Sequence, residues 1–187
     1  MKELIAPLSE STVRNLKLGD IVYISGPMIT GRDEMHMRAM EYSELGKGVP
    51  KDINNSVLFH CGPIVVDTFD GWKIIAAGPT TSARMNSLEP DMIRKFRIRA
   101  IIGKGGMSEE VGKAMAEVGC VYLAAVGGAA VSTAETLKVT GVEWTDLGMA
   151  EAMWKMDAER LGPLIVAMDS NGGSLYDQVK WSLVRDI

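Results

Sequence analysis

Cysteine is scarce in this chain of 187 residues, which contains only Cys61 and Cys120. Two cysteines are too few for a disulfide framework and too few to form a metal cage on their own. Neither has a second thiol nearby in the sequence, so we expect both to lie in or near the core. Such sparse cysteine is typical of a reducing compartment, and we therefore predict a cytoplasmic protein.

The sequence also lacks an excess of charge of either sign and a long hydrophobic run. Lys and Arg number 20 and Asp and Glu number 24, which gives a formal net charge of -4. This balance gives no electrostatic reason to expect nucleic acid or an anionic membrane as a partner. Apolar runs such as residues 121–126 fall far short of the roughly 20 residues that cross a bilayer. The N-terminal segment carries Glu3 and Glu10 and does not resemble a signal peptide, so we expect a soluble protein.

Phenylalanine is rare, with three residues, whereas methionine is abundant, with 13. Methionine fills irregular gaps in a core, and we favour that interpretation. The alternative is that the Met-rich segments 35–40 and 149–156 form an apolar surface that binds a partner. The remaining composition, 47% hydrophobic and 24% charged, is typical of a globular protein. The length predicts one domain that spans residues 1–187.

Short apolar runs alternate with helical stretches along the chain. We predict strands at residues 21–25, 57–59, 63–66, 72–77, 100–103, 120–126 and 163–169, and helices at 36–45, 88–97, 108–119, 130–138 and 174–187. Residues 142–147 begin a strand or turn, and residues 149–161 form a separate amphipathic segment. Glu89 is interpreted as a first-turn acid that the helix dipole favours. The strand–helix–strand unit at 100–126 predicts parallel pairing, and the earlier short strands predict a second β layer or small barrel. We therefore expect a compact α/β fold with three layers.

The first loop with unusual chemistry is segment 25–38, where a strand ends at Gly-Pro and a helix begins near Arg32 and Asp33. An arginine beside the positive end of a helix offers a planar, two-pronged site for a carboxylate. His36 lies one turn further on and is a candidate to orient Asp33 or a ligand. Ordinary helix capping, with Arg32 in solvent, is the alternative.

A second Gly-Pro ends the strand before segment 80–84, which reads Thr-Thr-Ser-Ala-Arg. Hydroxyls and backbone N–H groups before a helix can form an anion site, for which Arg84 supplies the charge. Thr80 and Thr81 would act as neutral donors. The alternative is a hydroxyl-rich turn that only caps the next helix.

The third loop follows the buried strand 100–103 and reads Gly103-Lys104-Gly105-Gly106. Glycines let the backbone approach a ligand, and Lys104 places a charge there. The spacing matches neither a P-loop nor a dinucleotide-binding fingerprint. A further pair, Gly127-Gly128, favours close backbone packing or another wall of the same cleft.

The three loops together predict a cleft whose cations are Arg32, Arg84 and Lys104. Three cations without an evident set of metal ligands suit a small di-acid better than a sugar or an apolar substrate. The sequence contains no Ser-His-Asp order, HExxH motif or CxxC motif that would indicate another chemistry.

Several ordered motifs give the chain a family resemblance. The segments GDIVYISGPMITGRDEMHMR, LFHCGPIV, AAGPTTSARMN, IIGKGGM and AVGGAAV resemble the β subunit of two-subunit class I fumarases and L(+)-tartrate dehydratases. They are also similar to the C-terminal domain of single-chain class I fumarases. The resemblance covers about residues 18–169. It implies a swivelling β/β/α domain that closes over a [4Fe-4S] cluster held by three cysteines of a separate α subunit.

The resemblance also implies an activity: reversible hydration of fumarate to (S)-malate, or dehydration of tartrate to oxaloacetate. An iron of the cluster would act as a Lewis acid on the substrate. In this chain Arg32, Arg84 and Lys104 match the family's carboxylate-binding cations. Thr80 matches the threonine proposed to transfer a proton, and Lys104 would assist it. Thr81 is a neighbouring candidate for substrate binding. Asp33 and His36 would support these residues without touching the substrate.

Two other functions remain open at this stage. The same loops would suit an L(+)-tartrate dehydratase β subunit. A non-catalytic module that binds a di-acid and regulates a partner would also use the cations, but it would show no turnover. In each case we expect a small dicarboxylate ligand and a hetero-oligomer, with no metal held by this chain alone.

Overall fold

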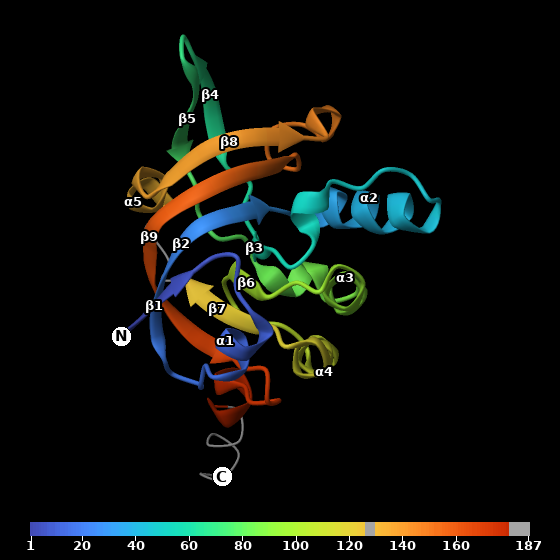
Figure 1. Ribbon diagram of the computed structural model, residues 1–187, viewed down its shortest axis with the longest axis vertical. Helices are drawn as coiled ribbons and strands as arrows, with labels where there is room; N and C mark the ends of the chain where they lie inside the picture. The colour runs from blue at the N-terminus through green and yellow to red at the C-terminus, as the bar shows by residue number, and fades with distance from the viewer. Residues whose placement is uncertain (126–129, 180–187) are drawn as a thin grey trace.

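The computed structural model describes residues 1–125 and 130–179 (Figure 1). Its strands are β1 Lys2–Ile5, β2 Ile21–Thr30, β3 Val57–Phe59, β4 Ile64–Thr68, β5 Gly71–Ala76, β6 Ala100–Gly103, β7 Val121–Ala125, β8 Leu137–Glu143 and β9 Met153–Met168. Its helices are α1 Glu10–Arg14, α2 Asp33–Glu44, α3 Glu89–Phe96, α4 Glu109–Val118 and α5 Ala130–Glu135. Short 3₁₀ turns lie at Lys51–Ile53, Ser82–Met85 and Thr145–Leu147.

One long strand closes the main sheet on itself. The strand order is β1-β2-β3-β6-β7-β9-β8, with an additional pairing of β2 to β9. Strands β1, β2, β3, β6 and β7 pair in parallel, whereas β9 runs antiparallel to β2, β7 and β8. Because β9 pairs with both β2 and β7, the central strands form a closed ring. Strands β4 and β5 form a separate hairpin that projects from it (Figure 1).

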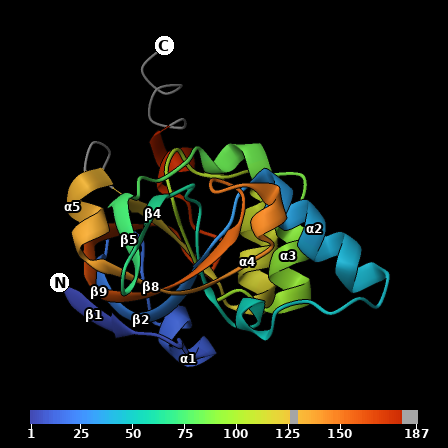
Figure 2. The same ribbon diagram turned by 90° about the horizontal axis from the view of Figure 1, so that it is seen from above.

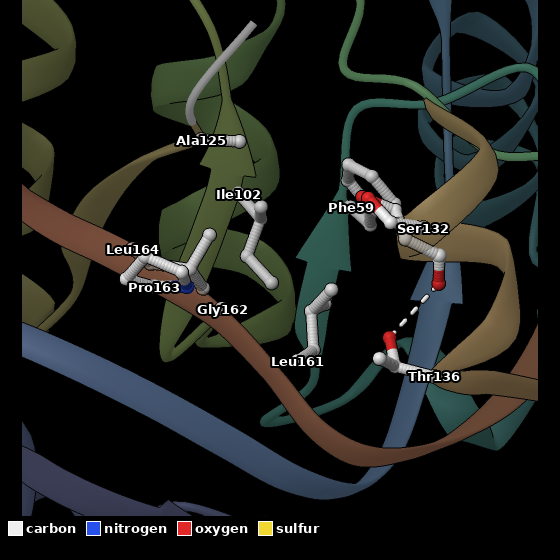
Figure 3. Close-up of a pocket in the computed structure, with 10 residues that line it drawn as sticks. Phe59, Ile102, Ala125, Ser132, Thr136, Leu161, Gly162, Pro163 and Leu164 are labelled. Carbon is white, nitrogen blue, oxygen red and sulfur yellow. Dashed lines mark hydrogen bonds between the residues drawn. The ribbon is translucent and has the colours of Figure 1, made fainter. Parts of the chain in front are cut away.

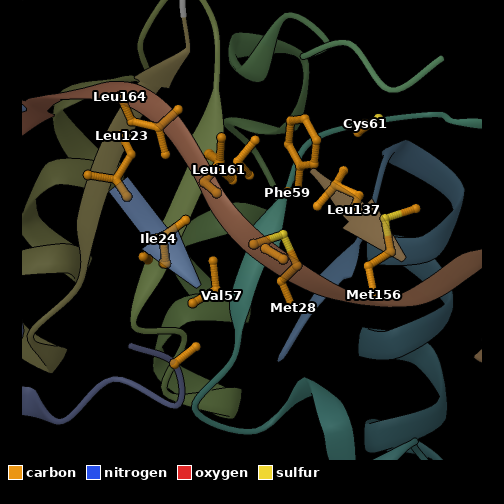
Figure 4. Close-up of a cluster of buried hydrophobic side chains, with 14 of the residues drawn as sticks. Ile24, Met28, Val57, Phe59, Cys61, Leu123, Leu137, Met156, Leu161 and Leu164 are labelled. Carbon is orange, nitrogen blue, oxygen red and sulfur yellow. The ribbon is translucent and has the colours of Figure 1, made fainter. Parts of the chain in front are cut away.

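The central parallel strands β3 and β6 are apolar on both faces because both of their faces are buried. In β3, Val57 and Phe59 point into the ring, where they pack in the inner core (Figure 4), while Leu58 points outward. The outward face packs against α2, α3 and α4, which lie together on one side of the sheet (Figure 2). The layers are therefore two of β structure and one of α structure, which confirms the predicted three-layer α/β fold.

Gly26-Pro27, predicted to end a strand, and Gly162-Pro163, predicted to lie where a strand begins, both lie inside strands. Strand β2 continues through Gly26-Pro27 to Thr30, and β9 runs through Gly162-Pro163. At both pairs the register between β2 and β9 shifts, which accommodates a residue without a ladder N–H. The prediction of an amphipathic segment at 149–161 separate from a strand at 163–169 was therefore wrong.

Other boundaries also differ from the predictions. Helix α5 ends at Glu135, and strand β8 already begins at Leu137, so the predicted helix over 130–138 was too long. Helix α2 begins three residues earlier than predicted. The predicted C-terminal helix is present at residues 175–179, while its remainder, 180–187, lies outside the described residues, as does Gly127-Gly128. No helix in the described part of the chain has the length and hydrophobicity needed to cross a membrane.

Methionine serves mainly as a core residue, as predicted. Eight methionines are buried: Met28, Met35, Met85, Met92, Met115, Met153, Met156 and Met168. The segments 35–40 and 149–156 therefore do not form continuous apolar surfaces, although Met37 and Met149 are exposed. Cys61 and Cys120 are both buried, also as predicted.

Candidate functional site

The three cation-bearing loops meet at one edge of the sheet. We name them the Arg32 loop (residues 30–33), the Thr80 loop (77–84) and the Lys104 loop (103–106). Strands β2, β3 and β6 are parallel neighbours, and the carboxyl ends of parallel strands lie at a common edge. The Arg32 loop leaves the end of β2, and the Lys104 loop leaves the end of β6. The Thr80 loop returns to the same edge from the β4–β5 hairpin.

Backbone hydrogen bonds join the Thr80 loop to the Lys104 loop. The N–H of Lys104 donates to the carbonyl of Thr80 at 3.4 Å, and the N–H of Ser82 donates to the carbonyl of Lys104 at 3.1 Å. Thr81 and Lys104 thus form an isolated parallel bridge. On the other side, the N–H of Thr80 donates to the carbonyl of His60 at 2.7 Å. Two residues that the sequence singled out independently, Thr80 and Lys104, are therefore backbone neighbours.

An ion pair links the Thr80 loop to the Arg32 loop. Nη2 of Arg84 lies 2.9 Å from Oδ2 of Asp33, the first residue of α2. The Arg84 side chain is half exposed, so the pair is screened and easily exchanged for another carboxylate. The carboxylate of Asp33, predicted only as a supporting residue, thus binds Arg84 where a carboxylate ligand would bind.

Arg32 is also paired with a carboxylate of this chain. Its Nε lies 3.2 Å from Oε1 of Glu151, and the other oxygen of Glu151 accepts the N–H of Glu34 at 3.0 Å. A Cβ at position 62 would lie 2.9 Å from Nη1 of Arg32, so Gly62 leaves room for the guanidinium. Glu151 was not predicted, because it lies more than 100 residues away in the turn before β9 and no local pattern marks it.

His36, a candidate to orient Asp33 or a ligand, directs its two ring nitrogens to other groups, while the charge of Asp33 helps to raise its pKa. It is fully buried, and its two ring nitrogens face different groups. Nδ1 lies 2.7 Å from the carbonyl oxygen of Arg32, and Nε2 lies 2.9 Å from Oε2 of Glu89. Nε2 of His60 lies 3.1 Å from the same oxygen. Glu89 and His60 are also fully buried.

The contacts define where the protons lie. A carbonyl and a carboxylate can only accept, so both nitrogens of His36 carry protons and the ring is a cation. Burial alone would lower the pKa of His36, but the Glu89 carboxylate outweighs burial and raises it. For His60 burial wins and lowers the pKa, so this ring is neutral. Burial opposes ionisation of Glu89, yet the two histidines bring its pKa down to about 2.

The polar contacts continue from His60 to the Lys104 loop. Nδ1 of His60 lies 2.9 Å from Oγ of Ser82, and the Tyr122 hydroxyl donates to the same Oγ at 2.9 Å. The N–H of Gly106 donates to the Tyr122 oxygen at 3.4 Å. Because the Ser82 oxygen accepts from Tyr122, its own O–H donates a hydrogen bond to Nδ1 of His60, which agrees with a neutral ring. We call this set of buried side chains the buried network: His36, Glu89, His60, Ser82 and Tyr122.

Most of the buried network was not predicted. Glu89 was interpreted as a helix-dipole acid, and it is indeed the first residue of α3, but its carboxylate points into the protein. A signal was present, because His36 and His60 are the chain's only histidines and each lies in an apolar or loop segment near a strand end. The ligand atoms of the three side chains lie within 4.8 Å of one another, a spacing that metals also use. Direct contacts of 2.9 and 3.1 Å, with both His36 nitrogens acting as donors, favour the hydrogen-bonded state.

The cysteines do not fit an iron–sulfur cluster. Cluster ligation requires several thiolates at one place. Burial raises the pKa of the Cys61 thiol to about 12 and that of Cys120 well above its ordinary value, so both stay protonated. Cys61 packs in the inner core and Cys120 in the outer core, on opposite sides of the sheet. The two cysteines, both within the described residues, therefore do not supply a set of cluster thiolates.

A cavity of about 200 Å³ lies between β3, β6, β9 and α5 (Figure 3). Its walls are mostly apolar side chains such as Phe59, Ile102 and Leu161, with hydroxyls from α5. Arg32, Arg84 and Lys104 do not line it. Its chemistry does not suit a dicarboxylate, so the cation-bearing edge is the candidate site.

Comparison with known proteins shows the family of this chain. Residues 2–179 match the family described as Fumarase C-terminus. The chain is 46% identical over 174 residues to "Putative L(+)-tartrate dehydratase subunit beta" of Methanocaldococcus jannaschii, and the match covers 92% of this chain and 89% of that protein. It is 34% identical over 185 residues to "L(+)-tartrate dehydratase subunit beta" of Escherichia coli K12, with 96% and 88% covered.

A third relative is a longer chain. "Putative fumarate hydratase class I" of Geobacillus stearothermophilus is 41% identical over 186 residues, which are 98% of this chain and 35% of that protein. The two tartrate dehydratase relatives are named as β subunits, and such naming implies an α subunit in those enzymes. Since the family model matches nearly the whole chain, the chain belongs to the Fumarase C-terminus family.

Proposed function

We propose that this chain is the β subunit of a two-subunit class I fumarate hydratase, a hydro-lyase that reversibly hydrates fumarate to (S)-malate. Membership of the Fumarase C-terminus family supports this proposal, as do relatives named for fumarate and tartrate dehydration. Substrate binding and proton transfer would be the tasks of this chain. We propose an α subunit as its partner.

The observation that carries the proposal is the backbone pairing of the Thr80 loop, which contains Arg84, with Lys104. Arg84 and Arg32 each hold a carboxylate of this chain, at 2.9 and 3.2 Å, in pairs that remain partly open to solvent. The half-exposed Arg84 pair contributes only about 0–1 kcal/mol, so a substrate carboxylate can replace Asp33 at little cost. Arg32 and Glu151 are only 21% and 18% exposed, so exchange of that pair costs more. A guanidinium binds a carboxylate with two parallel hydrogen bonds, which fixes its orientation as well as its position.

Thr80 is our candidate for the group that moves the proton at the reacting carbon. A threonine hydroxyl is a weak acid, so an alkoxide needs a nearby positive charge. Lys104 can supply that charge, because the two residues are hydrogen-bonded through their backbones. Thr81 lies beside them and is a further candidate for substrate contact, while Asp33 and His36 support the arginines.

The iron–sulfur cluster implied by the family resemblance would belong to the α subunit. Its role would be to polarise the substrate, a chemistry that none of this chain's groups supplies. The buried, protonated state of Cys61 and Cys120 supports that division of labour. The β subunit would then contribute the orientation of both substrate carboxylates and the proton transfer.

Reconstitution tests the proposal directly. The chain is mixed with its anaerobically prepared α subunit, and fumarate hydration is measured for wild type, Thr80→Val and Lys104→Met. Loss of a positioned proton-transfer group costs about 10²–10⁴-fold in kcat/KM, and we expect losses in this range. Lys113→Met is the matched control, because Lys113 is exposed on α4 and pairs only with Glu109 and Glu110. Equal activity of Lys104→Met and Lys113→Met would refute the site.

L(+)-tartrate is the second candidate substrate, since both relatives of similar length to this chain carry that name. The ratio of kcat/KM for (S)-malate to that for L(+)-tartrate decides between the two enzymes. Binding of either di-acid without turnover, in the presence of an active α subunit, would instead identify a regulatory module.

A further inference from the structure

The structure assigns a positioning role to the buried network: we propose that it holds the Arg32, Thr80 and Lys104 loops at fixed positions relative to one another. This inference deepens the proposed function and rests on it. None of the five side chains has to touch substrate. Each acts through a loop that carries a residue proposed to do so.

The network reaches all three loops. At one end, Nδ1 of His36 binds the carbonyl of Arg32 itself. In the middle, Ser82 belongs to the Thr80 loop, and the carbonyl of His60 accepts the N–H of Thr80 at 2.7 Å. At the other end, the Tyr122 hydroxyl accepts the N–H of Gly106 in the Lys104 loop. A connected series of buried contacts therefore links all three loops of the candidate site.

The network has a single consistent direction of hydrogen bonding. Gly106 donates to Tyr122, Tyr122 to Ser82, and Ser82 to His60. From the opposite end, His36 donates both to the Arg32 carbonyl and to Glu89, which His60 faces with its remaining N–H. The two series of contacts meet at Oε2 of Glu89, which faces both histidines. Because every member is buried, loss of one group leaves its neighbours without partners and without water.

Small movements of these loops would affect catalysis more than stability. A displacement of about 1 Å between reacting groups can cost 10²-fold in rate. Ser82 is the most informative member, since its hydroxyl joins His60 to Tyr122 within the Thr80 loop. Tyr122 is the second, since it is the network's contact with the Lys104 loop.

Nuclear magnetic resonance of the full chain tests the proton assignment without the α subunit. Labelling with ¹⁵N-histidine gives only two imidazole rings, and the variants His36→Gln and His60→Gln assign them. We expect protons on both nitrogens of His36 and only on Nε2 of His60 at neutral pH. In Glu89→Gln we expect His36 to lose one proton. Two neutral rings in the wild type would overturn the inference. So would one equivalent of zinc that stays bound through purification and is lost in Glu89→Gln, because the nitrogens would then be ligands.

Activity and amide exchange test the positioning role. In Ser82→Ala and Tyr122→Phe we expect kcat for the reconstituted enzyme to fall at least tenfold, and the Gly106 amide to exchange hydrogen faster. Ile98→Val, a buried core change outside the network, is the control for lost stability and should keep kcat. Variants of Ser82 and Tyr122 that retain wild-type kcat, or that lose it only in proportion to Ile98→Val, would overturn the role. Absence of turnover in the wild type would refute the proposed function instead. The amide-exchange and histidine NMR data would still show whether the buried network holds the three loops.

Discussion

A methyl group added at Gly103 would collide with the hydroxyl of Ser82. The ideal Cβ position at residue 103 overlaps Oγ of Ser82 and lies 2.9 Å from the Tyr122 hydroxyl. Gly103 is the last residue of β6 and is buried, so its backbone cannot easily move away. Gly103→Ala therefore has to displace Ser82 and break its contacts with His60 and Tyr122.

The expected cost has two parts. Overpacking of a well-packed interior costs about 1–3 kcal/mol, and each buried polar group left without a partner costs about 1–3 kcal/mol. We expect a total loss of about 2–6 kcal/mol, which at roughly 2–4 °C per kcal/mol for a chain of this size lowers Tm by about 4–24 °C. Thermal unfolding followed by circular dichroism measures the loss. Gly48→Ala is the matched control, because nothing lies within 4 Å of its Cβ position. We expect it to change stability by less than about 0.5 kcal/mol.

A double-mutant cycle separates the collision from other effects of the methyl group. Ser82→Ala removes the Oγ with which the new Cβ collides. Combined with Gly103→Ala, it should therefore cost less than the sum of the two single changes, with a coupling of about 1–2 kcal/mol. Simple additivity would refute the steric argument, and so would a Tm for Gly103→Ala equal to that of Gly48→Ala.

Two further predictions concern titratable groups. The pKa of Glu89 is lowered from 4.5 to about 2, so its contribution to stability is complete above pH 4.5 and disappears as pH falls toward 2. At about 1.4 kcal/mol per unit this is on the order of 3 kcal/mol, and urea unfolding between pH 6 and 2 should show a steeper loss in wild type than in Glu89→Gln. An equal loss of unfolding free energy with falling pH in both proteins would contradict the ionised state of Glu89. Cys61 and Cys120 are buried and protonated, so a thiol reagent at pH 8 should modify neither in the native chain and both after denaturation. Rapid modification of native Cys61 would show that this thiol is accessible.

Much of the fold could be predicted because the central strands β3, β6 and β7 lack charged residues along their whole length. Runs such as residues 100–103 indicate a strand buried on both faces, and a helix between two such strands implies parallel pairing. The closure of the ring could not be predicted in the same way. It depends on β9, whose two halves contact β2 and β7, and its Gly162-Pro163 pair has the composition of a strand end. Long-range pairing overrides that local signal.

The visible parts of the candidate site were predictable for a related reason. Arg32, Arg84 and Lys104 follow glycines or hydroxyls at strand or turn ends, where polar residues have no structural necessity. Partners that come from distant segments leave no such mark. Glu151 was missed because it reaches Arg32 from the turn before β9. The Asp33–Arg84 pair was missed because its members belong to different loops.

Glu89 shows why a residue's place in a helix does not define its role. A first-turn carboxylate in solvent gains about 0.3–1 kcal/mol from the helix dipole. The same carboxylate, fully buried, must recover a desolvation cost of several kcal/mol, and it does so through two histidines brought by α2 and the segment after β3. An apolar side chain in its place could give a chain of similar stability. What an apolar side chain could not do is hold the Nε2 atoms of both histidines, at 2.9 and 3.1 Å, at one oxygen. The buried charge therefore contributes geometry: it fixes His36 against the Arg32 carbonyl and His60 against Ser82, and through them it sets the spacing of the loops that carry the cations.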